Sequence, residues 1–131
     1  MDTLKLKDIL KNAGVAGAGG AGFPAYGKVT DKADTLILNC AECEPLLKLH
    51  RLLLENEADK ILKALSAVRE TIGAKEFVVA VKGSYTGAVN AVKKALSGYP
   101  DGRLHILREV YPSGDEVILV YDVTGKIVPA G

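Results

Sequence analysis

The chain has 131 residues, of which 48% are hydrophobic and 25% are charged, and its formal net charge is +1 at pH 7. A chain of this length forms a single domain that buries roughly two-thirds of its unfolded surface, and the near-zero charge argues against nucleic acid or an anionic membrane as a partner. No stretch reaches the roughly 18 apolar residues of a membrane span and no apolar signal segment begins the chain, so we expect a cytoplasmic protein without direct membrane insertion.

The first predicted element is a helix over residues 3–12. Its leucines and isoleucine recur at helical spacing with lysines between them. Asn12 and Gly14 then follow in the manner of a helix C-terminus. A helix, and not a strand, therefore leads into the next segment.

That next segment, GVAGAGGAGFPAYGK (14–28), is rich in glycine. Gly17, Gly19 and Gly22 match the spacing G-x-G-x-x-G, but the dinucleotide-binding fingerprint requires a strand before the loop. Glycines at this density still let the backbone approach an anion closely. Pro24 suits the first turn of a short helix that would add its positive end. A flexible linker is the alternative interpretation.

Strands and helices alternate along the rest of the chain. The predicted strands cover residues 34–39, 76–82 and 103–110, and the predicted helices cover residues 44–56, 57–73 and 84–98. This alternation predicts an α/β fold: a three-layer, Rossmann-like parallel sheet with flanking helices, preceded by the glycine-rich loop.

Two of these elements carry further expectations. The run EFVVAVK (76–82) is short and rich in β-branched residues, which predicts a strand buried on both faces. Ser84 or Thr86 is expected to cap the helix that follows. A broad apolar stripe is expected on the helix over 44–56, formed by Leu46, Leu47, Leu49, Leu52, Leu53 and Leu54.

Ligands of such sheets bind beyond the carboxyl ends of the strands. The first strand ends at Asn39 and enters CAECEP, and the third ends near Val110 and enters YPSGDE. Glu42 and Glu44 would accept hydrogen bonds from a ligand's hydroxyl or amide groups. A solvated turn explains the same pair of carboxylates equally well.

Cys40 and Cys43 have the spacing of half a zinc site or of a redox dithiol. A second cysteine pair, which a zinc site of this type needs, is missing from the sequence. We therefore expect no metal site, and two cysteines fit a reducing compartment. His50 and His105 are expected to be structural or exposed.

Three segments in this order, GAGGAGFPAYGK, LILNCAECEP and YPSGDEVILVYDVTGKIVPAG, resemble the FMN- and NADH-binding domain shared by the flavoprotein subunit of respiratory complex I and by RnfC. The resemblance covers nearly the whole chain. The Glu-Cys-Glu-Pro form of the middle motif and YPSGDE resemble RnfC-like proteins, including PrdC and PduS-type proteins, more closely than complex I.

The resemblance implies roles for the glycine-rich segment. Phe23 would stack on the pyridine nucleotide, and Lys28 would lie near the flavin phosphate or the nucleotide. The glycines that would wrap the flavin and the nucleotide are Gly17, Gly19, Gly20 and Gly22.

The resemblance also implies roles at the strand exits. Asn39 and Glu42 would meet the flavin, and Glu44 would be a carboxylate on the nucleotide side. Gly114 and Glu116 fall where the family places its third cofactor loop. No catalytic side chain is implied, because hydride transfer belongs to the flavin.

The resemblance changes one structural prediction. On β-propensity DEVILVYDVTG would be a strand, but its counterpart in the family is a helix. We therefore expect a helix from Asp115 or Glu116 to Thr124, with Gly125 as its C-terminal stop. On such a helix, one face would carry Val117, Val120, Tyr121 and Thr124.

These implications describe a flavin module of an RnfC-like oxidoreductase. It would pass electrons from NADH through FMN to iron–sulfur domains or subunits outside this chain, within a complex that other subunits attach to a membrane. No iron–sulfur cluster is expected within residues 1–131, because the sequence ends before the family's cysteine motifs, as an excised or truncated domain would.

Two alternatives remain open. Complex I has arginine where this chain has Ala18 and aspartate where it has Ala41. These departures allow a non-catalytic scaffold or docking domain that keeps the fold without the cofactor. A weaker alternative is a true Rossmann enzyme with an unidentified substrate.

Overall fold

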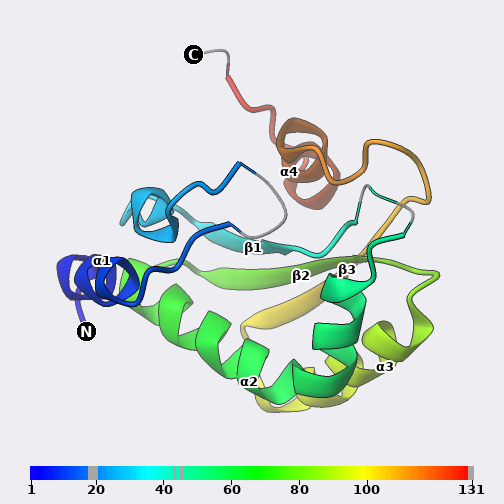
Figure 1. The fold of residues 1–131 in the computed structure, drawn as a ribbon, viewed down its shortest axis with the longest axis horizontal. Helices are drawn as coiled ribbons and strands as arrows, with labels where there is room; N and C mark the ends of the chain where they lie inside the picture. The colour runs from blue at the N-terminus through cyan, green and yellow to red at the C-terminus, as the bar shows by residue number, and fades with distance from the viewer. Residues whose placement is uncertain (18–20, 43, 45, 130–131) are drawn as a thin grey trace.

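A computed structural model describes residues 1–17, 21–42, 44 and 46–129. Its centre is a sheet of three parallel strands in the order β1 (Thr35–Asn39), β2 (Glu76–Lys82) and β3 (Gly102–Leu107). Helices cover both faces of this sheet (Figure 1). The predicted three-layer, Rossmann-like α/β architecture is confirmed.

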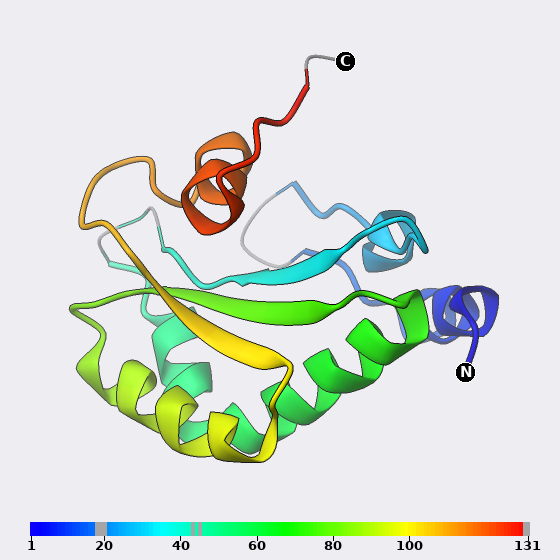
Figure 2. The ribbon, with the colours of Figure 1, turned by 180° about the vertical axis from the view of Figure 1, so that it is seen from behind.

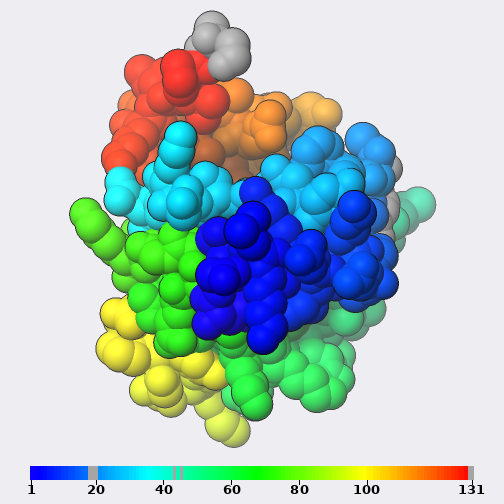
Figure 3. Space-filling view, turned by 90° about the vertical axis from the view of Figure 1, so that its left-hand side faces the viewer, coloured from blue at the N-terminus to red at the C-terminus, as the bar shows by residue number. Residues whose placement is uncertain are grey.

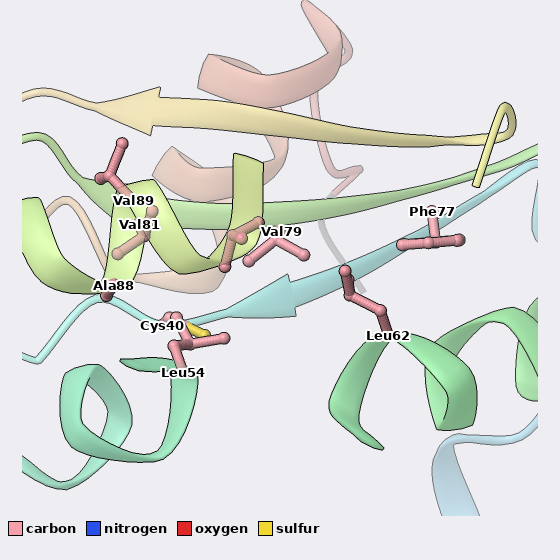
Figure 4. Close-up of a cluster of buried hydrophobic side chains, with 9 residues drawn as sticks. Cys40, Leu54, Leu62, Phe77, Val79, Val81, Ala88 and Val89 are labelled. Carbon is pink, nitrogen blue, oxygen red and sulfur yellow. The ribbon is translucent and has the colours of Figure 1, made fainter. Parts of the chain in front are cut away.

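The central strand β2 has the bounds predicted from the sequence, and its five inner residues are buried. Its side chains alternate between the two faces of the sheet. Phe77, Val79 and Val81 pack with Leu54 and Leu62 in the larger apolar cluster (Figure 4). The intervening residues of β2 point to the opposite face, where they pack on a separate cluster.

The larger cluster is covered by α2 (Leu49–Ile72) and α3 (Thr86–Ala95), and the latter continues into the 3-10 turn η2 (Leu96–Gly98). Two helices were predicted over residues 44–73. Within α2, Glu57 is non-helical (φ −129°, ψ 23°) and marks a kink between two helical segments, at the boundary predicted between them.

Two boundaries of the predicted elements need correction. The third strand ends at Leu107 and not near residue 110, because its partner Lys82 is the last residue of β2 and none of the described residues continues the ladder. The N-cap of α3 is Tyr85, and neither Ser84 nor Thr86 caps it with a side-chain hydrogen bond. The main-chain N–H of Ser84 instead donates to the Glu109 carboxylate at 2.9 Å, which ties the loops after β2 and β3 together.

The opposite face of the sheet is covered by α4 (Glu116–Thr124), as Figure 2 also shows. The predicted helix is confirmed with its predicted bounds, and Gly125 ends it at φ 71°. The residues that pack on the sheet are Leu119 and Val123, neither of which belongs to the set predicted to share one face. Val117 and Tyr121 are exposed.

The amino-terminal helix α1 (Thr3–Asn12) closes one end of the domain. Leu6 packs with Ile72 and Ala74 in a third small cluster. Figure 3 shows this end, with α1 lying across the surface beside α2 and the segment before β1. The short 3-10 helix η1 (Ala25–Lys28) follows Pro24, as predicted for a helical turn after the glycine loop.

The predicted leucine stripe is not a core stripe. Leu54 alone among its members is buried, at 1% exposure, whereas the others are 45% exposed or more. Leu46 and Leu47 precede α2, which begins at Leu49 and not at residue 44. For the leucines on the helix, the periodicity does not reveal which side of the helix another element covers. Within the described residues, no helix is both long and apolar enough to cross a membrane.

Candidate functional site

The carboxyl edge of the sheet brings two of the predicted loops together. Asn39, the last residue of β1, donates from Nδ2 to the main-chain oxygen of Gly114 at 2.9 Å. Its Oδ1 accepts a hydrogen bond from the N–H of Ala41 at 3.1 Å. One amide side chain therefore joins the exit of β1 to the loop that leads into α4.

The Glu42 side chain is buried at 6% exposure. Its Oε1 accepts a hydrogen bond from the His50 N–H in the first turn of α2 at 2.8 Å, so this carboxylate lies on the α2 side of the loop and caps that helix. Glu42 Oε2 and His50 Nδ1 are buried without a hydrogen-bond partner among the described residues. Glu44 is exposed.

Two residues at the exit of β2 contact the same loop, and sequence reasoning missed both. Lys82 donates from Nζ to the main-chain oxygen of Glu42 at 3.3 Å. Tyr85 lies three residues after Lys82. The pKa of its hydroxyl is raised, mainly by burial and secondly by the charge of Glu42. The Arg51 guanidinium lies 4.9 Å from the centroid of the Tyr85 ring. The sequence signal for Lys82 was its place directly after the apolar run FVVAV (77–81), as the charged last residue of β2.

The third loop lies between β3 and α4. Ser113 is 4% exposed, and its hydroxyl has no hydrogen-bond partner within the described ranges. Asp115 is the N-cap of α4, where its carboxylate accepts from the N–H groups of Val117 at 3.1 Å and Ile118 at 3.4 Å. Glu116 in the first helical turn is exposed.

The glycine loop is closed at its base by main-chain hydrogen bonds. The N–H of Gly17 donates to the Phe23 carbonyl at 3.0 Å, and the N–H of Ala25 donates to the Val15 carbonyl at 2.9 Å. Gly22 has φ 69°, a conformation that favours glycine. The predictions for the remaining two glycines, Gly19 and Gly20, fall on residues outside those that the structure describes.

Phe23, predicted to stack on the nucleotide, and Lys28, predicted to lie near the flavin phosphate or the nucleotide, lie together. The Lys28 ammonium is 5.6 Å from the centroid of the Phe23 ring, within cation–π range. Phe23 is 53% exposed. In Figures 1 and 2 the described flanks of the glycine loop lie on the same side of the sheet as α4.

Lys28 and Asn39 do not lie at the same end of β1. Val29, next to Lys28, packs in a cluster with Leu36 near the start of the strand, whereas Asn39 ends it. Five residues of a strand span about 16 Å. Lys28 and Asn39 therefore lie near opposite ends of β1.

Cys40 is a free and buried cysteine in the larger apolar cluster. Burial, and secondarily the charge of Glu42, raises the pKa of its thiol to about 12. Such a thiol is a poor nucleophile and a poor metal ligand, because both roles need the thiolate. Cys43, its predicted companion in a dithiol, falls outside the described ranges.

Comparisons with known proteins place this fold. Residues 10–131 match the protein family described as the Nuo51 FMN-binding domain. The chain is 41% identical over 129 residues to cobalamin reductase PduS of Citrobacter freundii, covering 98% of this chain and 28% of that protein. It is 35% identical over 137 residues to one component of the Na⁺-translocating ferredoxin:NAD⁺ oxidoreductase complex of Acetobacterium woodii, covering 100% of this chain and 30% of that one.

A solved structure agrees in fold. The crystal structure of an NAD⁺-reducing [NiFe]-hydrogenase in the air-oxidized state superimposes with a TM-score of 0.79 at 24% identity, over 95% of this chain and 24% of that chain. The chain thus spans less than a third of the length of each of these relatives. Because the family match covers nearly the whole sequence, the resemblance inferred from the three motifs is confirmed, and the chain belongs to the Nuo51 FMN-binding domain family.

Proposed function

We propose that this chain is an FMN-binding electron-transfer module that takes electrons from NADH and passes them to iron–sulfur centres outside the chain. The observation that carries the proposal is the bond between Asn39 and Gly114. It joins two of the three motif loops at the carboxyl edge of a parallel sheet, where ligands of this fold class bind. Membership of the family supports the choice of FMN.

The described residues fit a flavin nucleotide in three respects. Gly22 has a positive φ that residues with a side chain rarely adopt, so the backbone stays bare at this position of a loop that would approach a phosphate. Lys28 offers an exposed cation near the base of the same loop. The Ser113 hydroxyl is a buried polar group that lacks a partner, and such groups point to a missing ligand or water.

These features suggest that different groups along β1 bind different parts of the flavin nucleotide. The glycine loop and Lys28 would hold the phosphate, and Asn39 with the main chain around Gly114 would hold the polar edge of the ring. FMN, when bound, supplies the hydride-accepting chemistry, and the protein supplies orientation and charge.

The exposed ring of Phe23 offers a stacking face to a nicotinamide nucleotide. The exposed carboxylates of Glu44 and Glu116 offer acceptors to its ribose hydroxyls. Both roles belong to the proposal. The acceptor of the electrons would be an iron–sulfur domain or subunit of a larger complex, as names such as ferredoxin:NAD⁺ oxidoreductase for the relatives suggest.

One observation favours a second function, a scaffold domain without cofactor. Glu42, one of the predicted flavin ligands, uses its carboxylate to cap α2. A capped helix needs no ligand. The scaffold hypothesis therefore predicts that neither FMN nor NADH binds.

The test is a fluorescence titration of the purified chain with FMN and with riboflavin, which lacks the phosphate. We expect FMN to bind at least about tenfold more tightly than riboflavin, the worth of one charge-assisted hydrogen bond. Lys28→Ala should reduce that preference, whereas Lys5→Ala on α1 should not. Addition of NADH under anaerobic conditions should then bleach the bound flavin. Absence of binding by both flavins would favour the scaffold.

A further inference from the structure

Lys82 lies at the middle of the carboxyl edge. It is the last residue of β2, the central strand. Alternation along the strand puts its side chain on the face of Val78 and Ala80, which is the face that α4 covers. Asn39 shares that face, because Ile37 two residues before it packs on the same cluster. Lys82 and Asn39 thus project from neighbouring strands toward the side of the proposed cofactor site.

The Lys82 ammonium fixes the main chain of the neighbouring loop. It donates to the Glu42 carbonyl oxygen at 3.3 Å. Asn39 holds the same loop one residue earlier, through the N–H of Ala41 at 3.1 Å. The path of residues 39–42 is therefore set at two points by side chains from two strands.

The Glu42 side chain is held from the other direction. Its carboxylate accepts from the His50 N–H at 2.8 Å, so the side chain is fixed to α2 while the carbonyl is fixed to β2 by Lys82. A loop held on both sides keeps its backbone groups in place before a ligand arrives, which reduces the ordering cost of binding.

We propose that Lys82 is a positioning residue for the flavin, which acts by holding the Glu42 carbonyl so that residues 39–42 keep the shape that the cofactor needs. This inference rests on the proposed function. It assigns to the exit of β2 a role that none of the three motif loops contains.

Loss of the Lys82 ammonium is expected to weaken FMN binding without lowering the stability of the fold. Lys82 is only half-buried and packs no apolar cluster, so its loss should loosen one loop and leave the core intact. The Lys82→Met variant keeps the aliphatic stem and removes the donor. Lys82→Arg keeps a cationic donor, and Lys93→Met, on the exposed surface of α3, is the matched control.

The experiment compares FMN dissociation constants with thermal unfolding of the flavin-free chain. For Lys82→Met we expect the dissociation constant to rise about tenfold, with a melting temperature close to that of the wild type and faster hydrogen exchange at the Ala41 and Glu42 amides. Lys82→Arg should restore binding to within about threefold, since its donor is retained. Lys93→Met should change neither quantity.

Two results would overturn the inference, and they differ from failure of the proposed function. If the wild type binds FMN and Lys82→Met binds it equally well, Lys82 does not position the site. The same conclusion follows if the Lys82→Met melt falls while its affinity is unchanged, because the role is then structural. If Lys82→Met does not fold, Lys82→Gln takes its place under the same criteria. Absence of FMN binding by the wild type would instead refute the proposed function.

Discussion

Replacement of Glu42 by alanine separates the capping role of this residue from a role in binding. The carboxylate is buried at 6% exposure and accepts a hydrogen bond from the His50 N–H at 2.8 Å. Loss of such a cap costs about 0.5 to 2 kcal/mol, and loss of a negative charge at a helix N-terminus adds about 0.3 to 1 kcal/mol. Oε2 is buried without a partner among the described residues. Its removal ends an unfavourable desolvation and offsets about 1 kcal/mol of the lost stability.

The three contributions sum to a net loss of about 1 kcal/mol in the free energy of unfolding for Glu42→Ala. For a domain of this size that corresponds to a fall of roughly 3 to 5 °C in melting temperature. Glu42→Gln should cost less, about 0 to 1 kcal/mol, because the amide oxygen still accepts from His50. Glu44→Ala is the matched control: its side chain is exposed, so we expect a change within about 0.5 kcal/mol.

Urea denaturation of the flavin-free variants at pH 7, followed by circular dichroism, measures these differences. Unchanged stability of Glu42→Ala would refute the capping role. It would return Glu42 to the role predicted from the resemblance, in which its charge serves the ligand alone.

Further predictions concern the core, the buried thiol and one ion pair. Leu54→Ala should cost about 2 to 5 kcal/mol in urea denaturation, because Leu54 is 1% exposed, whereas Leu53→Ala, on the exposed side of the same helix, should stay within about 0.5 kcal/mol; equal losses would contradict the described packing. Cys40 in the folded chain should resist a thiol reagent at pH 8, because its pKa is raised to about 12, and should react in urea; mass spectrometry of its peptide after brief labelling checks this, and rapid labelling of the folded chain would contradict it. The hydrogen bond from Arg103 lowers the pKa of Glu76, so the stability that this pair contributes should be fully present above about pH 4.3, the unfolded value, and be lost as the pH falls through the lower folded pKa. The contribution should be small, because both side chains are more than a third exposed. In Arg103→Met this part of the pH dependence of the free energy of unfolding should be absent, and an unchanged pH dependence would contradict the assignment.

The sequence predicts those elements whose pattern has one structural meaning. Strand β2 has its predicted bounds because five consecutive apolar residues between Glu76 and Lys82 fit a strand buried on both faces. Helix α4 was predicted only through the family resemblance, since Val117 to Val120 favour a strand locally. Its sheet-facing residues, Leu119 and Val123, were missed for the same reason.

The sequence predicts which loops form the candidate site, but it does not predict the contacts between their residues. Asn39 was found because the end of a strand in an α/β sheet is a binding position. The capping role of Glu42 depends on where α2 begins, which is Leu49 and not residue 44, and a start of that kind is set by tertiary contacts. Lys82 was missed because a lysine at a strand end is ordinary in sequence; only the 3.3 Å contact with the Glu42 carbonyl distinguishes it.

The most direct test of the account is a ¹⁵N-labelled NMR titration of the chain with FMN. The account predicts saturable shifts at the amides of Gly17, Gly22, Ala41 and Gly114, with the Asn39 side-chain amide, and unchanged signals on the exposed side of α3. Shifts that are absent at saturating FMN, or that gather on α2 and α3 away from the carboxyl edge of the sheet, would contradict it.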